Sequence, residues 1–268
     1  MALGIIIVGA LGRMGVEVAK LVLEDNALKL NACIEYPGHP KIGEDYGTCI
    51  GMGNLGIKLT DSVTGVDYSN SVVVDFSSPQ ASRTLLKNAE EKGMKLVICT
   101  TGLNEEDLKM AHAVSKKVPV IVSPNTSIGV NLLFSITQMV ASKLKDDFDI
   151  EIIEAHHRFK KDAPSGTAKK LGEIVAEEMG LSYEEAVVNG REGIQSQERS
   201  RNVIGMHAIR GGDIVGDHTV LFAGMGERVE LRHIAQSRVI LARGAITTAK
   251  WIANKPAGFY TMKDVLGF

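Results

Sequence analysis

The stretch Gly4-Ile-Ile-Ile-Val-Gly-Ala-Leu-Gly-Arg-Met-Gly15 decides the fold of this 268-residue chain. Residues 4–8 are a short apolar run, which predicts a buried parallel strand. Three glycines follow with the spacing G-x-x-G-x-x-G instead of the more usual G-x-G-x-x-G, and apolar residues then recur at helical spacing. A strand, a glycine-rich turn and a helix in this order indicate dinucleotide binding, although any tight strand–helix turn would share the pattern.

The next predicted strand, residues 28–34, ends in an acidic residue. Glu35 stands about 20 residues beyond the glycines, where a carboxylate can bind the adenosine ribose hydroxyls. The order of strand, turn, helix, strand and acid therefore strengthens the prediction of a dinucleotide site.

The strand–helix alternation continues to about residue 126. Apolar runs predict strands at 71–76, 95–99 and 119–122, and Ser78-Pro79 and Asn104 are helix-start signals. Such repeats indicate a parallel sheet with helices on both faces, whose ligands lie beyond the carboxyl ends of the strands. Asp75 lies at such an end and is interpreted as a satisfied structural carboxylate. Residues 36–56 are predicted to form a loop.

The second half of the chain changes character. A long helix is predicted for 128–144, then a strand that ends at His156, a helix at 166–179 and a polar loop at 182–202. Three strands, 203–210, 217–223 and 228–236, are joined by Gly211-Gly212 and by Gly224-Met-Gly226, both of which are hairpin signals. These patterns predict an antiparallel or mixed sheet. The helix at 242–253 is expected to pack back on the first domain.

The stretch from Glu154 to Leu171 carries the chemistry. Two histidines, an arginine and two lysines fall within residues 156–161. Ser165 then predicts a helix N-cap, with Gly166 and Thr167 in the first turn, whose free N–H groups favour an anion. A proton donor, cations and an anion site thus occur together. The alternative is a solvated basic loop before a surface helix.

Composition narrows the class of protein. The chain is 44% hydrophobic and 23% charged, with a net charge of −2, so no overall field favours nucleic acid or a membrane surface. Three cysteines without a C-x-x-C pair indicate neither disulfides nor a metal site, and fit a reducing cytoplasm. The first apolar run is too short to span a membrane. Three histidines are interpreted as structural: His207, His218 and His233.

Both motifs together, Gly9-Ala-Leu-Gly-Arg-Met-Gly15 and Glu154-Ala-His-His-Arg-Phe-Lys-Lys-Asp-Ala-Pro-Ser-Gly-Thr-Ala168, resemble those of the 4-hydroxy-tetrahydrodipicolinate (dihydrodipicolinate) reductase family. The resemblance implies NAD(P)H-dependent reduction of a cyclic dicarboxylate in lysine and diaminopimelate biosynthesis. It also implies an α/β fold: a Rossmann-type parallel-sheet nucleotide domain plus an inserted α+β domain with an open mixed sheet. We expect the nucleotide domain at 1–127 and 240–268, and a substrate-binding and oligomerisation domain at 128–239 that assembles a homotetramer.

The resemblance also assigns roles by position. The general acid falls on His156, with His157 as its rival, and a second catalytic cation falls on Lys160. The substrate-binding positions of the family fall on the residue after the acid and on the start of the following helix: His157, Ser165, Gly166 and Thr167. Cofactor-contacting positions match four segments of the first domain: Gly9, Ala10, Leu11, Gly12, Arg13 and Met14; Glu35; Cys99, Thr100 and Thr101; Ser123, Pro124, Asn125 and Thr126.

The sequence departs from the family pattern at a few positions. Many relatives have glycine at position 99 and small residues near 123 and 124, where backbone contacts would survive. Some relatives have arginine after the ribose-binding acid, where this chain has Tyr36. A 2′-phosphate needs a nearby cation, so we expect NADH to be used at least as well as NADPH unless Lys41 or Arg13 supplies the charge.

Two competing functions remain at this stage. A dehydrogenase acting on an amino-acid aldehyde would share the nucleotide domain but has no need for His156, Lys160 and the Ser-Gly-Thr helix start together. A non-catalytic NAD sensor would need neither the proton donor nor the cation. For the predicted reductase, we expect the two domains to close near residues 126–128 and 237–241.

Overall fold

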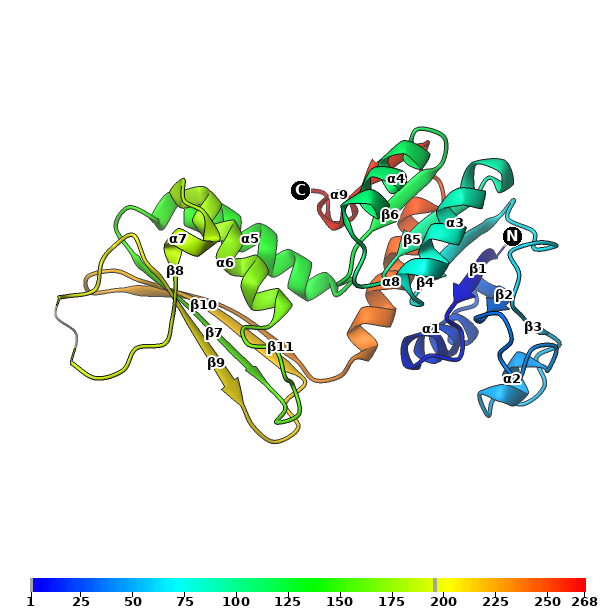
Figure 1. Cartoon of the computed structure of the whole chain (residues 1–268), viewed down its shortest axis with the longest axis horizontal. Coiled ribbons are helices and arrows are strands. Elements are labelled where there is room, and N and C mark those ends of the chain that lie inside the picture. Colours follow the sequence, from blue (N-terminus) through cyan, green and yellow to red (C-terminus); the bar gives the residue numbers. More distant parts are fainter. Residues whose placement is uncertain (1, 195–196) are drawn as a thin grey trace. The chain divides into compact units, whose positions relative to one another are not determined.

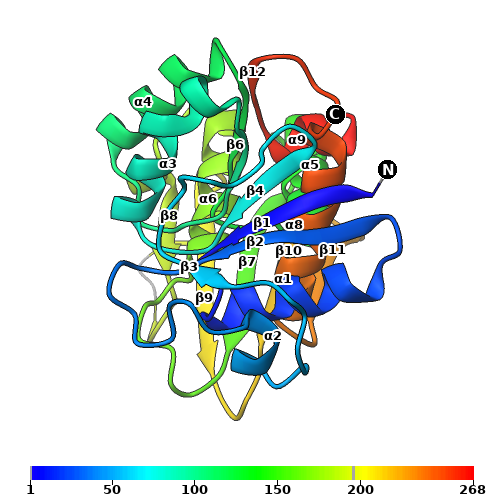
Figure 2. The same ribbon diagram turned by 90° about the vertical axis from the view of Figure 1, so that its right-hand side faces the viewer.

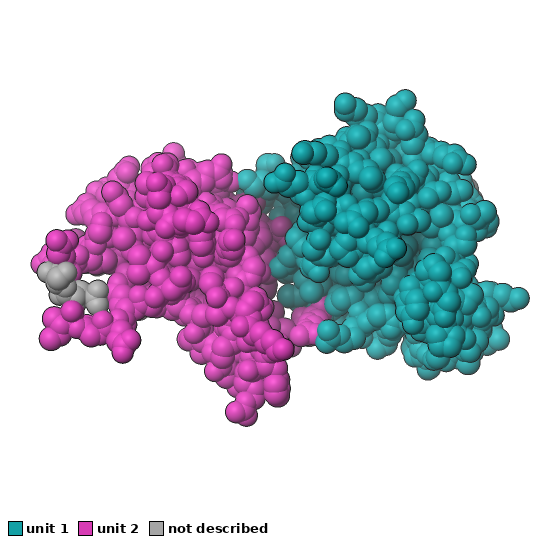
Figure 3. Space-filling view, viewed as in Figure 1, with its two compact units in different colours: residues 1–128, 239–268 teal, residues 129–238 magenta. Residues whose placement is uncertain are grey.

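The computed structural model describes residues 2–194 and 197–268, which form two compact units. Unit 1 consists of residues 1–128 and 239–268, and unit 2 consists of residues 129–238 (Figure 3). The chain leaves unit 1 once and returns to it once, so unit 2 is an insertion. Each unit has its own sheet and its own hydrophobic core.

Unit 1 contains a seven-stranded, fully parallel sheet in the order β12-β6-β5-β4-β1-β2-β3. The strands β1 and β4–β6 coincide with the apolar runs of the sequence, because strands buried on both faces need no polar alternation. The strand bounds are β1 Leu3–Val8, β2 Leu28–Ile34, β3 Leu59–Thr60, β4 Ser71–Asp75, β5 Lys95–Ile98, β6 Pro119–Val122 and β12 Gly258–Tyr260.

Helices cover both faces of this sheet (Figure 2). The helices α1 and α8 pack on one face, and α3 and α4 pack on the other. Side-chain caps start α3 at Ser78 and α4 at Asn104, as the sequence predicts. The helix bounds in unit 1 are α1 Arg13–Glu24, α2 Tyr46–Cys49, α3 Pro79–Lys92, α4 Glu105–Ser115, α8 Val239–Ile252 and α9 Met262–Leu266.

Unit 2 contains a five-stranded mixed sheet in the order β11-β10-β7-β9-β8. The central strand β7 pairs antiparallel with β10 and parallel with β9. The helices α5 and α6 lie over one face of this sheet (Figure 1). The bounds are α5 Ile128–Leu144, β7 Asp149–His156, α6 Gly166–Met179, α7 Tyr183–Ala186, β8 Val187–Asn189, β9 Ile204–Arg210, β10 Gly216–Ala223 and β11 Arg228–Ala235.

One of the two predicted hairpins is wrong. The turn at Gly224–Gly226 does join neighbouring antiparallel strands, because Ala223 pairs with Arg228. The turn at Gly211-Gly212 instead connects β9 to β10 across β7, which lies between them. A glycine pair signals a tight turn, but it does not reveal that an earlier strand has entered the sheet. Two predicted loops, 36–56 and 182–202, also contain the short elements α2, α7 and β8.

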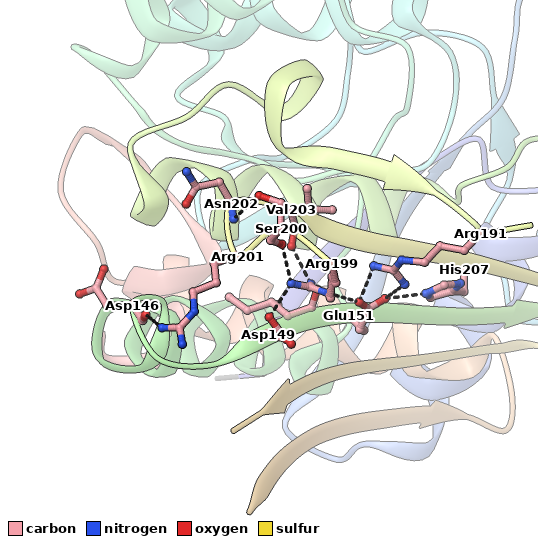
Figure 4. A network of polar contacts seen from close by, with 11 residues as sticks. Asp146, Asp149, Glu151, Arg191, Arg199, Ser200, Arg201, Asn202, Val203 and His207 are labelled. Atoms are coloured by element: carbon pink, nitrogen blue, oxygen red, sulfur yellow. Dashed lines mark hydrogen bonds and ion pairs between the residues drawn. The ribbon is translucent and has the colours of Figure 1, made fainter. Parts of the chain in front are cut away.

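The face of β7 opposite the helices carries a charged network (Figure 4). Glu151 accepts hydrogen bonds from Arg191 and Arg199, at 2.8 and 2.9 Å to Oε1, and contacts Nε2 of His207 at 2.7 Å. Burial would raise the pKa of Glu151, but these partners outweigh it and hold the pKa at about 2. Arg191 and Arg199, which lie in the predicted polar loop, therefore tie their own positions in the chain to the sheet.

Candidate active site

The helix-covered face of β7 ends in two ionisable side chains. Ile150 and Ile152 are buried in the core, and Glu154 continues the same row with no exposed surface. His156 closes the strand, with 12% of its side chain exposed. Because alternate residues of a strand share a face, β7 places a carboxylate at the rim of the core and an imidazole just beyond it.

Glu154 has a complete set of hydrogen-bond partners. Arg210 at the end of β9 binds both of its oxygens, at 2.8 and 2.9 Å. The backbone N–H of Ser165 donates to Oε1 at 3.1 Å, and Nδ1 of His156 lies 2.5 Å from Oε2. Burial would raise the pKa of Glu154, but the hydrogen bonds from Arg210 and His156 outweigh it and lower the pKa. The sequence analysis gave neither Glu154 nor Arg210 a role.

The helix α6 begins beside this carboxylate. Ser165 is its N-cap and its hydroxyl accepts the N–H of Ala168 at 3.2 Å, as the sequence predicts. Gly166, the first helical residue, is exposed, and a Cβ placed there would meet no atom within 4 Å. The start of α6 is therefore open at Gly166, and the unsatisfied N–H groups and the dipole of a helix start favour an anion.

His218 on β10 completes the group. It pairs directly with Glu154 across the sheet, and its Nε2 lies 3.0 Å from the Ser165 hydroxyl. Its ring meets that of His156 edge to face, with centroids 5.2 Å apart. Burial, and next the charge of His156, lower the pKa of His218 to about 4, so this ring is neutral near pH 7. The sequence indicated a structural role for His218, and its contact with the N-cap Ser165 fits that role; its place beside the candidate acid was not predicted.

The loop after β7 holds the predicted cation. Lys160 Nζ lies 2.8 Å from Asp162, and 21% of the lysine side chain is exposed. The backbone of the loop is tied to the β9–β10 connection, because Arg158 N–H donates to the Gly212 carbonyl at 3.1 Å. The neighbouring His157 has a buried Nδ1 to which the described residues offer no hydrogen-bond partner. His156 and Lys160 thus lie in one segment that β9 and β10 support.

In unit 1, the glycine-rich turn is packed too tightly for side chains. Gly9 has a φ of +76°, and a Cβ there would lie 2.7 Å from the Phe76 carbonyl oxygen. A Cβ on Gly15 would lie 2.3 Å from the Gly9 oxygen. Gly12 is the N-cap of α1 and provides no side-chain cap. The start of α1 therefore presents bare backbone, which suits a pyrophosphate.

The predicted ribose-binding acid lies at the end of β2, next to this turn. Glu35 accepts the backbone N–H of Leu11 at 2.9 Å and that of Tyr36 at 3.1 Å. A cavity of about 590 Å³ opens here; its lining includes Gly9, Gly12, Glu35, Tyr36, Asp61 and Gln80. Among the described residues that line it, two are carboxylates and none is a lysine or arginine. Arg13 and Lys41 are not part of the lining.

The other predicted cofactor segments also lie at carboxyl ends of strands. Cys99, Thr100 and Thr101 follow β5, and Ser123, Pro124, Asn125 and Thr126 follow β6. The thiol of Cys99 is buried, and burial raises its pKa, so only the backbone of this residue is available to a ligand. Asp75 is buried and accepts hydrogen bonds from Ser77 and Ser82, which confirms its interpretation as a satisfied structural carboxylate.

The described part of the chain contains neither a candidate metal centre nor a helix that could span a membrane. In residues 2–194 and 197–268, no histidine, cysteine or acidic side chains are grouped so that three of them would hold a metal ion. No helix within the same residues combines the length and the apolar character needed to cross a bilayer.

Comparisons with known proteins identify the family. The family model for "Dihydrodipicolinate reductase, N-terminus" matches residues 3–126, and that for "Dihydrodipicolinate reductase, C-terminus" matches residues 129–266. The curated 4-hydroxy-tetrahydrodipicolinate reductase of Geotalea daltonii is 43% identical over 259 residues, 97% of each chain. The protein of that name from Trichlorobacter lovleyi is 45% identical over 266 residues, 98% of each chain.

A solved structure agrees in fold. Dipicolinate-bound dihydrodipicolinate reductase from Paenisporosarcina sp. TG-14 has a TM-score of 0.77 and 23% sequence identity, covering 97% of this chain and 98% of the other. Since the family models match both halves and the curated relatives match nearly the whole length, the chain belongs to the dihydrodipicolinate reductase family.

Proposed function

We propose that this protein reduces 4-hydroxy-tetrahydrodipicolinate to tetrahydrodipicolinate, with loss of water and with NAD(P)H as reductant, in lysine and diaminopimelate biosynthesis. One observation carries the proposal: a member of this family holds His156, Lys160 and the open start of α6 together at the end of β7. A proton donor, a cation and an anion site are what a cyclic dicarboxylate undergoing reduction requires.

His156 is the proposed general acid. Loss of water from the substrate leaves a conjugated imine, and the bound cofactor supplies the hydride that reduces it. The resulting electron-rich ring carbon must then gain a proton. Imidazole titrates near neutral pH, so His156 can carry this proton at the rim of the core and release it to the ring.

The neighbouring groups hold the substrate in this proposal. The N–H groups of Gly166 and Thr167 and the dipole of α6 bind one carboxylate, and Ser165 fixes the start of the helix by capping it. Lys160 leaves Asp162 and pairs with charge that develops on the ring. His157 contributes a further contact. Positioning of the ring against the cofactor supplies part of the acceleration.

Unit 1 is the proposed NAD(P)H-binding unit, and Gly9–Met14 at the start of α1 bind the pyrophosphate. The glycines support this assignment. Gly9 and Gly15 let the turn pack closely, and the exposed Gly12 leaves the backbone at the start of α1 without a covering side chain. Glu35 binds the ribose hydroxyls; Cys99–Thr101 and Ser123–Thr126 contact the nicotinamide half. Among the described residues that line the cavity, a 2′-phosphate would meet two carboxylates and no cation, so we propose that NADH serves at least as well as NADPH.

Unit 2, extended to residues 128–239, is proposed to bind the substrate and to assemble a homotetramer. Its sheet leaves one face without helices, where Ile209 and Ile234 are each about half exposed. Exposed apolar side chains on an open sheet face favour a partner sheet. Sedimentation of the purified protein tests this: a tetramer supports it, and a monomer at micromolar concentration contradicts it.

An assay of NADH oxidation tests the proposed activity. The purified chain is mixed with NADH and the fresh product of dihydrodipicolinate synthase, and in parallel with an amino-acid aldehyde. We expect rapid oxidation with the first substrate only. Oxidation with the aldehyde alone would identify a different dehydrogenase, and cofactor binding without turnover of either would indicate a sensor.

A further inference from the structure

Glu154 and His156 form a carboxylate–imidazole pair at the end of β7. We propose that Glu154 is a positioning residue, which keeps Nδ1 of His156 protonated so that the second proton of the charged ring, on Nε2, is the one delivered to the substrate, and that Arg210 keeps Glu154 in place. The inference rests on the proposed role of His156 as the acid and goes beyond it by naming the donor atom and the group that selects it.

The hydrogen bonds leave only one direction for the His156–Glu154 contact. Arg210 binds both oxygens of Glu154, and the N–H of Ser165 binds Oε1 as well. A carboxyl group paired with an arginine in this way is ionised and can only accept. At 2.5 Å from Oε2, Nδ1 of His156 must therefore carry a proton. The lowered pKa of Glu154 agrees with this ionised state.

Nε2 is left for the substrate. On that side the ring of His156 adjoins Gly216 on β10, where a Cβ would come within 3.0 Å of Nε2. Glu154 and His218 contact the ring of His156 directly, and Arg210 binds Glu154. From the loop, Lys160 acts on the pKa of His218 and pairs with Asp162. Since Nδ1 is engaged with Glu154, only Nε2 can release a proton without breaking that contact.

A structural role for Glu154 is the alternative. It holds the N–H of Ser165, and Arg210 also donates to the Asp162 carbonyl at 2.6 Å, so the pair supports the loop before α6. A supporting role alone would change the stability of the fold but would not change which nitrogen of His156 is protonated. The two roles therefore differ in their consequences for His156.

The chain provides a matched control on the opposite face of β7. Glu151 also binds a histidine, His207, and two arginines (Figure 4), but its side chain lies on the face of β7 opposite to that of Glu154. Replacing Glu151 by glutamine removes an equally paired carboxylate from the same strand. If Glu151→Gln has the same effect as Glu154→Gln, that effect comes from the loss of a carboxylate that stabilises the sheet, and not from a change at His156.

A double-mutant cycle on the full chain tests the proposal. We expect Glu154→Gln and His156→Gln each to lower kcat by at least ~10-fold, and the double variant to be no slower than His156→Gln, because Glu154 acts through His156. Glu151→Gln should combine multiplicatively with His156→Gln. Multiplicative effects of Glu154→Gln and His156→Gln would overturn the positioning role. If His156→Gln leaves kcat within about threefold of the parent, the proposed acid itself is wrong.

A measurement on the parent protein tests the tautomer of His156 directly. ¹⁵N NMR of the imidazole distinguishes the two neutral tautomers. We expect the neutral ring of His156, assigned by comparison with His156→Gln, to be protonated at Nδ1. Protonation at Nε2 would overturn the proposal even if every variant lost activity.

Discussion

A Cβ on Gly216 would lie 3.0 Å from Nε2 of His156, so a side chain at position 216 would press against the nitrogen that is proposed to deliver the proton. The φ of Gly216 lies outside the left-handed region, and the residue begins the regular strand β10. Alanine is therefore acceptable to the backbone. The lack of room for a Cβ beside the imidazole of His156, and not the backbone conformation, therefore explains the glycine at position 216.

We expect Gly216→Ala to lower kcat by about 10-fold or more while the protein stays folded, because the methyl group displaces the ring and narrows the approach to Nε2. Gly211→Ala is the matched control: a Cβ there meets no atom within 4 Å and the φ is also not positive. Steady-state kinetics of both variants decide the matter. Equal activity of the two would show that nothing approaches Nε2 from this side.

Two adjacent lysines allow the proposed catalytic cation to be compared with a solvated one. Lys160 is partly buried and paired with Asp162, whereas Lys161 is exposed. We expect Lys160→Met to lower kcat by at least ~10-fold, because the developing charge on the substrate loses its partner. Lys161→Met should remain within about threefold of the parent, because an exposed charge contributes little. Comparable losses in both would indicate general attraction of the anionic substrate.

Local sequence signals predicted half of the candidate site. The Ser165 cap, the end of β7 at His156 and the glycine turn at Gly9–Gly15 all follow from short patterns, and the structure shows each of them. The cap and the turn need only neighbouring residues, and the alternation before His156 needs only one strand. Each of these features depends on interactions between residues that are close together in the sequence.

Non-local strand pairing could not be predicted in the same way. Arg210 and His218 reach Glu154 only because β7 lies between β9 and β10, whereas the Gly211-Gly212 signal suggested that β9 and β10 were neighbours. The short strands β3 and β12, with two and three residues, carry too few side chains to show a pattern. The contacts of Glu154 with Arg210 and His218 thus depend on the order of the strands in the sheet, which short sequence patterns do not reveal.

His218 makes the stability of unit 2 depend on pH. Its pKa is about 4 in the folded protein and about 6.5 in the unfolded chain. Between these values the unfolded chain binds more protons, so the contribution of the neutral, buried ring is complete above about pH 6.5 and is lost as the pH falls to 4. The shift corresponds to roughly 3 kcal/mol of unfolding free energy.

We expect His218→Gln to remove this dependence, because glutamine reaches Ser165 without titrating. Urea unfolding at several pH values measures it: the free-energy advantage of the parent over the variant should shrink by about 3 kcal/mol between pH 7 and pH 4. An advantage that stays constant over this range would mean that the histidine is charged, or solvated, in the folded protein.

Position 36 is the place where the choice of nicotinamide cofactor can be changed. Tyr36 follows Glu35, the proposed ribose-binding acid, and is 59% exposed at the cavity, whose described lining has two carboxylates and no cation. We expect Tyr36→Arg to raise the ratio of kcat/KM for NADPH to that for NADH by about 10-fold, because a guanidinium can pair with the 2′-phosphate.

Tyr36→Gln separates the new charge from the loss of the aromatic ring. It removes the ring, which contacts His39 edge to face, and adds no charge. If the charge is responsible, the ratio for Tyr36→Gln stays near that of the parent and only arginine raises it, and the rise weakens as salt screens the pair. A parent enzyme that already prefers NADPH tenfold would show that a cation from outside the described cavity lining reaches the 2′-phosphate.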